Sequence, residues 1–114
     1  PDFGGIISSV LSYIDQNITA KITLDDIEKY AFVSKFHICH KFKRTVGMTP
    51  GEYILKRRLS LAKKLLSGSD SALSEIAMST GFGSFSYFSS SFKRLEGITP
   101  TEYRRRYRNS PLAK

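Results

Sequence analysis

The chain has 114 residues, 40% of them hydrophobic, with eight Phe and six Tyr, so it can bury a core as one small domain or as two very small ones. This content excludes a disordered tail, and the single cysteine, Cys39, excludes an internal disulfide and fits a reducing compartment. The net charge of +8 is uneven, since residues 1–28 carry −4 and residues 29–114 carry +12. A folded chain with such a surplus is expected to face a polyanion, either nucleic acid or a membrane surface.

Nothing in the sequence predicts membrane insertion. No apolar run approaches the ~20 residues that span a bilayer, and the first residues lack the layout of a signal peptide. Because the first residue is Pro1 and a helical pattern begins almost at once, we expect a fragment of a longer polypeptide.

The periodicity predicts about seven helices and no strand. In the first helix, the apolar residues from Ile6 to Ile14 recur at helical spacing. Thr23 is expected to cap a short second helix, with Asp26 three residues on and with Leu24 and Ile27 facing inward.

A third helix, capped by Ser34, runs into a motif that the chain contains twice. The motif is FKRTVGMTPGEY at 42–53 and FKRLEGITPTEY at 92–103. Each copy holds a capping box that starts a helix, Thr-Pro-x-Glu. Each also holds a glycine, Gly47 or Gly97, where the preceding helix must stop in a left-handed conformation. The repeat therefore predicts a helix end, a tight turn and a new helix start.

The remaining helices surround a linker-like stretch, SGSDS at 67–71. A longer helix after Pro50 is expected to reach about Leu66, a stiff spacer roughly 25 Å long. Three further helices are predicted: one through Leu73, Ile76 and Ala77, one capped by Ser84 and ending near Leu95, and one over about 100–108.

The two helices before each repeated motif are typical of a helix-turn-helix. In the second pair, Ala77 lets the helices approach and Gly81 takes the positive φ of the turn. In the first pair Glu28 and Phe32 stand at these positions, so we expect Glu28 to reach solvent and Phe32 to tolerate or reshape the turn. The helix after such a turn enters the DNA major groove. The alternative is a helical bundle with similar short turns.

Residues 76–104, IAMSTGFGSFSYFSSSFKRLEGITPTEYR, follow a known signature closely. Over roughly residues 6–107 the chain resembles the C-terminal DNA-binding domain of the AraC/XylS family of bacterial transcription regulators. The resemblance implies an all-α fold with two homeodomain-like helix-turn-helix subdomains, 1–48 and 68–114, joined by a linker helix, 49–67. It also implies that two recognition helices, about 35–46 and 85–95, enter successive major grooves of promoter DNA on one face.

For the rest of the protein, the resemblance implies a cytoplasmic regulator that acts mostly as an activator through RNA polymerase. An N-terminal part, absent from this chain, would sense an effector or dimerise. No cofactor and no catalytic residue is expected.

The same resemblance assigns the DNA contacts. Base contacts are expected at Lys35, Phe36, Cys39, His40, Phe85, Ser86, Ser89 and Ser90. Contacts to the DNA backbone are expected at Ser34, Lys43, Arg44, Ser84, Lys93 and Arg94. Core positions are expected at Ile38 and Phe42 in the first unit and at Phe82, Phe88, Phe92 and Leu95 in the second.

The chemistry of these positions differs between the two helices. His40 can hydrogen-bond a guanine or a phosphate, whereas Phe36 and Cys39 can pack against a thymine methyl. Core packing is the alternative for Phe36. The serine-lined face of the second helix offers small, permissive hydrogen bonds, so we expect it to discriminate bases less and to position the protein more.

Several alternatives remain open from the sequence. His37 matches Tyr87 and is expected to be structural, and His37, Cys39 and His40 do not share one helix face, which disfavours a metal site. The run RRRYR at 104–108 is either a phosphate clamp or a solvated helix end. A basic module for anionic membrane or a partner protein would need long apolar helix faces, but here those faces are used in a core. An enzyme is least expected, because no Ser–His–Asp set, carboxylate pair or phosphate-binding glycine loop is present.

Overall fold

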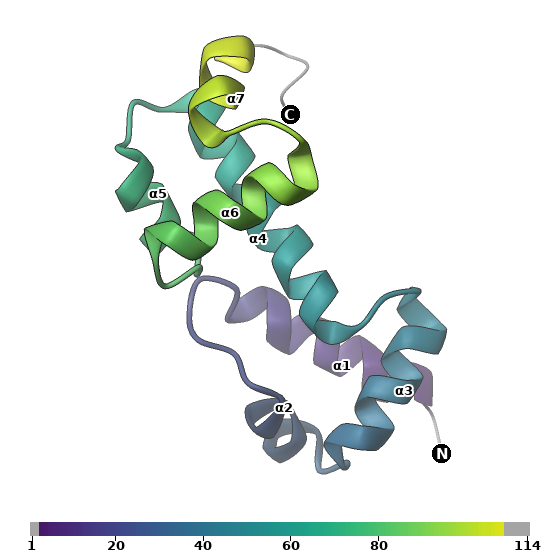
Figure 1. Cartoon of the computed structure of the whole chain (residues 1–114). Helices are drawn as coiled ribbons and strands as arrows, with labels where there is room; N and C mark the ends of the chain where they lie inside the picture. The colour runs from purple at the N-terminus through teal and green to yellow at the C-terminus, as the bar shows by residue number, and fades with distance from the viewer. Residues whose placement is uncertain (1–2, 109–114) are drawn as a thin grey trace. The chain divides into compact units, whose positions relative to one another are not determined.

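The computed structural model describes residues 3–108, and over these residues it contains seven helices and no strand (Figure 1). The helices are α1 (Phe3–Gln16), α2 (Leu24–Ala31), α3 (Lys35–Val46), α4 (Pro50–Gly68), α5 (Leu73–Ser79), α6 (Phe85–Glu96) and α7 (Pro100–Tyr107). The predicted all-α class and helix order are confirmed. The chain divides into two compact units, Pro1–Arg57 and Arg58–Lys114, with the boundary inside α4.

Local capping explains where several of the helices begin. At the start of α2, the Thr23 hydroxyl accepts a hydrogen bond from the Asp26 amide at 3.1 Å, and the Asp26 carboxylate accepts one from the Thr23 amide at 3.3 Å. Thr99 and Glu102 form the same reciprocal pair at α7. These capping boxes satisfy amides that an isolated helix end leaves without partners.

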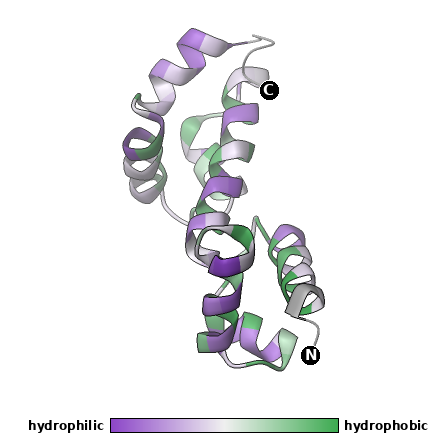
Figure 2. Ribbon diagram, turned by 90° about the vertical axis from the view of Figure 1, so that its right-hand side faces the viewer, coloured by the Kyte–Doolittle hydropathy of each residue, from purple (hydrophilic) through white to green (hydrophobic). Residues whose placement is uncertain are grey.

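The first unit is built around α1, α2 and α3, which pack against one another pairwise. Its core is mostly aliphatic: Ile7, Val10 and Ile14 from α1 are buried with Ile27 from α2 and with Ile38 and Phe42 from α3. The helices alternate between hydrophobic and hydrophilic residues along their length (Figure 2), as amphipathic helices do. The predicted core positions Ile38 and Phe42 of α3 are confirmed.

The second unit has an aromatic core. In it α6 packs against α5 and α7. Ring centroids lie 5.2 Å apart for Phe82 and Phe88, 5.8 Å for Phe88 and Phe92, and 5.5 Å for Phe92 and Tyr103. A fully buried Phe side chain stabilises a fold by about 1.5–3 kcal/mol, and these edge-on contacts add geometric preference. The row of rings therefore fixes the orientation of α6 about its own axis.

The repeated motif has the same physical role in both units. The Phe and Tyr that begin and end each copy meet edge to face, with centroids 5.7 Å apart for Phe42 and Tyr53 and 5.5 Å for Phe92 and Tyr103. Between them, Gly47 and Gly97 have φ of 92° and 83°, the left-handed region that glycine adopts readily. The motif thus holds each third helix against the helix that follows, as the repeated pattern predicts.

Two predicted core positions, Leu24 and Leu95, are wrong, whereas α4 ends at Gly68, close to its predicted end near Leu66. Leu24 is 40% exposed and Leu95 is 43% exposed, because each lies at a helix end, beyond the edge of its core. Ser67 and Gly68 belong to α4 rather than to the linker. The Ser67 side chain is buried, which favours the helical conformation at this position, and its hydroxyl finds a partner in the Lys63 carbonyl at 3.0 Å.

Candidate nucleic-acid interface

Helix α3 has one buried face and one open face. Its N-cap Ser34 accepts a hydrogen bond from the His37 amide at 3.3 Å, and burial of Ile38 and Phe42 sets the rotation of the helix. On the other side, Phe36 is 80% exposed and His40 is exposed. Core packing, the alternative for Phe36, is therefore wrong.

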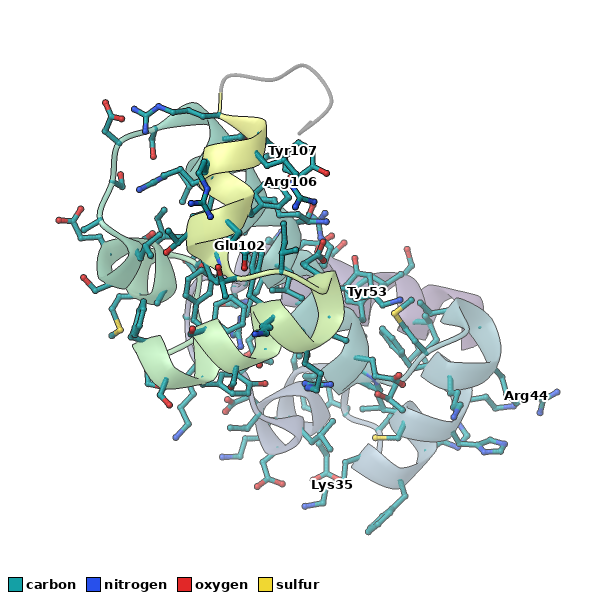
Figure 3. The ribbon with its side chains drawn as sticks, turned by 45° about the horizontal axis from the view of Figure 1, so that its top comes forward. Lys35, Arg44, Tyr53, Glu102, Arg106 and Tyr107 are labelled. Atoms are coloured by element: carbon teal, nitrogen blue, oxygen red, sulfur yellow. The ribbon has the colours of Figure 1, made fainter. Side chains whose placement is uncertain are left out.

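The other two predicted base contacts of α3 are half-buried. Cys39 borders a pocket of about 280 Å³ that it shares with Leu24 and Ile27 of α2. Lys35, at the start of the helix, projects from the ribbon (Figure 3), but its ammonium group lies 2.8 Å from the Asp25 carboxylate. The hydrogen bond and the positive charge of Lys35 lower the pKa of Asp25, so the pair is charged at neutral pH.

Glu28 differs from the prediction that it reaches solvent. It is half-buried, and its Oε2 accepts a hydrogen bond from the backbone amide of Lys35 at 2.8 Å. This amide belongs to the first turn of α3, where a helix has no internal partner for its N–H groups, and a negative charge there also favours the helix dipole. Glu28 therefore fixes the start of α3, a role the sequence did not reveal because the two residues are seven positions apart.

The corresponding face of α6 forms a shallow hollow of about 630 Å³. Six residues line it, and all six are predicted DNA contacts: Phe85, Ser86, Ser89, Ser90, Lys93 and Arg94. The opposite side of the helix is buried at Phe88, Ser91 and Phe92. The row of rings in the core thus directs this polar face outward.

The two N-cap serines keep a free donor for a phosphate. Ser84 accepts a hydrogen bond from the Tyr87 amide at 3.1 Å, as Ser34 does from His37. A serine hydroxyl that accepts one bond still has its own O–H to donate. Both are at helix N-termini, which favour negative charge.

The predicted backbone contacts at the other end of each helix are exposed cations. Lys43 and Arg44 lie in the last turn of α3, and Lys93 and Arg94 lie in the last turn of α6. Arg44 extends away from its helix (Figure 3). Cations in the last turn stabilise a helix through its dipole, and these side chains can reach a polyanion.

The run at 104–108 fits neither of its two alternatives as a whole. Arg104 turns toward α4, where its Nε donates to the Leu66 carbonyl at 3.1 Å. Arg108 forms an ion pair with Asp70. Arg105 and Arg106 are exposed on α7. Arg104 therefore joins α7 to α4 within the second unit, Arg108 has an exposed partner in Asp70, and two of the four arginines are left for solvent or phosphate.

Residues 3–108 contain neither a metal-ligand cluster nor a membrane-spanning helix. No group of three His, Cys, Asp or Glu side chains is placed to hold a metal ion in this part of the chain. Within the same range no helix is both long enough and apolar enough to cross a bilayer.

Known proteins share this arrangement. The helix-turn-helix domain family matches residues 27–106. The transcriptional activator AarP of Providencia stuartii is 38% identical over 99 residues, which cover 87% of this chain and 73% of AarP. The crystal structure of an AraC-type DNA-binding regulator from Chromobacterium violaceum has a TM-score of 0.83 at 31% identity and covers 95% of this chain and 96% of that one. The chain belongs to the AraC-type helix-turn-helix family.

Membership of the AraC-type family confirms the two helix-turn-helix units that the resemblance implied. The length of the relatives varies. The chain spans 37% of LumQ from Photobacterium leiognathi, with 39% identity over 92 residues, which cover 81% of this chain.

Proposed function

We propose that this AraC-type chain is the sequence-specific DNA-binding domain of a transcription regulator, with α3 and α6 as its recognition helices in successive major grooves. The observation that carries the proposal is the hollow on α6. Its lining consists only of residues that the family resemblance assigns to DNA, and the helix is held with that face outward by its buried aromatic side. The exposed Phe36 and His40 of α3 give the first unit an open face of a different chemistry.

The two helices make different kinds of contact with DNA in this proposal. On α3, His40 donates to a guanine or accepts from an adenine or cytosine amino group, and Phe36 packs against a thymine methyl. On α6, the serines offer single hydrogen bonds without the bidentate geometry that distinguishes bases well. The cations at the end of each helix, with the N-cap serines, hold phosphates and so fix the position of the protein on DNA.

The remaining proposals concern the whole protein. Because AarP is named an activator, we propose that the regulator activates transcription and contacts RNA polymerase. We further propose that a region outside this chain senses an effector or dimerises, that the protein acts in the bacterial cytoplasm, and that this domain binds DNA without catalysing a reaction.

Binding to duplex DNA as a function of salt tests the proposal. Each neutralised phosphate releases condensed counterions, so if about six phosphates are held, the slope of log K against log salt is expected to be about −5. Lys93→Ala should lower this slope by about one, because it removes one phosphate contact. The control Lys64→Ala removes an exposed lysine of α4 outside the proposed contact set and should leave the slope unchanged. A wild-type affinity that does not respond to salt contradicts the proposal, and affinity for anionic vesicles without affinity for DNA would favour a membrane module.

A further inference from the structure

Phe32 stands at a position where both its backbone and its side chain are unfavourably placed. It is the C-cap of α2, with φ of 57° and ψ of 33°, and among residues 3–108 it is the only non-glycine residue with positive φ. The left-handed region is strained for a bulky side chain. The side chain is also 92% exposed, the most exposed large apolar residue described.

Nothing within the first unit requires a phenylalanine here. The Phe32 backbone amide donates a hydrogen bond to the Glu28 carbonyl at 2.9 Å, and any residue except proline could donate it. In the second unit, glycine occupies the corresponding turn, with φ of 93° at Gly81. Glycine adopts that conformation without strain. The aromatic ring of Phe32 therefore gives the free domain neither burial nor a better turn.

The position lies at the leading end of the proposed recognition helix. Phe32 precedes the N-cap Ser34 by two residues, and Phe36, which is 80% exposed, follows in the first turn of α3. In a helix-turn-helix, the first residues of the second helix are those nearest the base edges. Two exposed aromatic side chains thus flank the helix start, beside the basic Lys35.

We propose that Phe32 is a specificity-determining residue whose ring packs against a thymine methyl group at the edge of the major groove that α3 occupies. This inference rests on the proposed function. Apolar contact with the thymine C5-methyl distinguishes this base in the major groove, and burial of the exposed ring against DNA removes apolar surface from water. The contact explains why the turn has an exposed aromatic residue in a strained conformation.

Two substitutions separate this role from a structural one. Phe32→Gly and Phe32→Asn both suit positive φ, and little burial is lost, so neither should lower the melting temperature by more than a few degrees. On a site selected with the wild-type protein, both should weaken binding by roughly fivefold to twentyfold. The salt slope should not change, because an apolar contact releases no counterions.

Replacing each thymine of that site by deoxyuridine, which lacks the methyl group, locates the contact. The wild-type protein should lose affinity at one thymine where Phe32→Asn shows no further loss. Met78→Gln serves as the matched control, because Met78 is also a large exposed apolar residue, 58% exposed on α5. The Met78→Gln variant should bind the site like wild type.

The inference is overturned if the Phe32 variants bind like wild type, if Met78→Gln loses as much affinity, or if wild type and Phe32→Asn respond alike at every deoxyuridine. A wild-type protein that shows no salt-dependent DNA binding would instead remove the proposed function itself.

Discussion

The ammonium group of Lys35 has two competing partners in the proposed complex. In the free protein it contacts the Asp25 carboxylate at 2.8 Å, and the hydrogen bond and charge of Asp25 raise the pKa of Lys35. A base edge or a phosphate must displace this carboxylate. Exposed ion pairs of this kind contribute little to stability, so DNA can replace Asp25 as the partner of Lys35 at a small cost. That cost lowers the affinity for DNA.

Asp25→Asn should therefore strengthen DNA binding. The change frees Lys35 and removes a negative charge beside the groove, and we expect the affinity at low salt to rise roughly twofold to fivefold. The measurement is a fluorescence titration of labelled duplex DNA at low and moderate salt. The gain should shrink as salt rises, because screening weakens the repulsion that the substitution removes.

Glu75→Gln is the control, since it removes an exposed carboxylate of α5 and changes net charge equally. Equal gains for both variants would show that Asp25 acts only through net charge. No gain for Asp25→Asn would place Lys35 outside the interface.

At the scale of single residues, helical periodicity predicted the buried positions in the middle of elements. Ile38 and Phe42 are spaced by one turn and both are buried. Leu24 and Leu95 have the same apolar character, but they lie at helix ends, where their side chains are only partly covered. Glu28 could not be assigned, because its partner is a backbone amide that only the folded turn brings within reach. Which of the exposed residues touch DNA remains a prediction.

The turns between the two helices of each helix-turn-helix differ in their backbone conformation. The α5–α6 turn has positive φ at Gly81 and Gly83, whereas the α2–α3 turn has it at Phe32 alone. Comparison of the two units in the sequence placed Phe32 opposite Gly81, and Phe32 adopts the positive φ of the turn. The first unit contains both this strained residue and the Glu28 carboxylate, which fixes the start of the next helix. In the second unit, Ala77 stands at the position of Glu28.

Gly81→Val should destabilise the fold. A β-branched residue at φ of 93° is strained by roughly 1–3 kcal/mol, and we expect the melting temperature, followed by circular dichroism, to fall by about 5–15 °C. Phe32→Gly should lower the melting temperature less, because it relieves backbone strain at positive φ and removes a side chain that is almost fully exposed.

Gly51→Val is the matched control, because Gly51 lies in the first turn of α4 with open space around its Cα and no positive φ. It should change the melting temperature little. Small and similar losses for Gly81→Val and Gly51→Val would show that Gly81 does not determine the turn.

Element boundaries followed from capping chemistry wherever the signal was local. The capping boxes at Thr23 and Thr99 lie where the sequence predicted them. The end of α4, at Gly68, lies close to the predicted end near Leu66. It depends on the buried Ser67 side chain and on Arg104 of α7, which donates to the Leu66 carbonyl. That second contact joins residues 38 positions apart, so no local pattern contains it.

For the whole molecule, the duplicated motif explains why so short a chain has two similar units. Each copy places a basic pair, Lys43–Arg44 or Lys93–Arg94, on the outside of a helix whose other face is held by the Phe–Tyr contact. The structural role of the repeat could be predicted from the sequence because its capping box and its helix-ending glycine lie close together in the chain. The proposed contact faces differ, aromatic and histidine-bearing on α3 but serine-lined on α6, so we expect two half-sites that differ in how strictly their sequence is defined.

Selection of binding sites from random duplex DNA, followed by hydroxyl-radical footprinting on the enriched sequence, tests this account most directly. Two recognition helices in successive major grooves predict a bipartite site with half-sites about 10 bp apart, protected on one face of the duplex. The half-site read by α3 should be the more strictly defined. Enrichment of a single uninterrupted half-site, or no enrichment at all, would contradict the account.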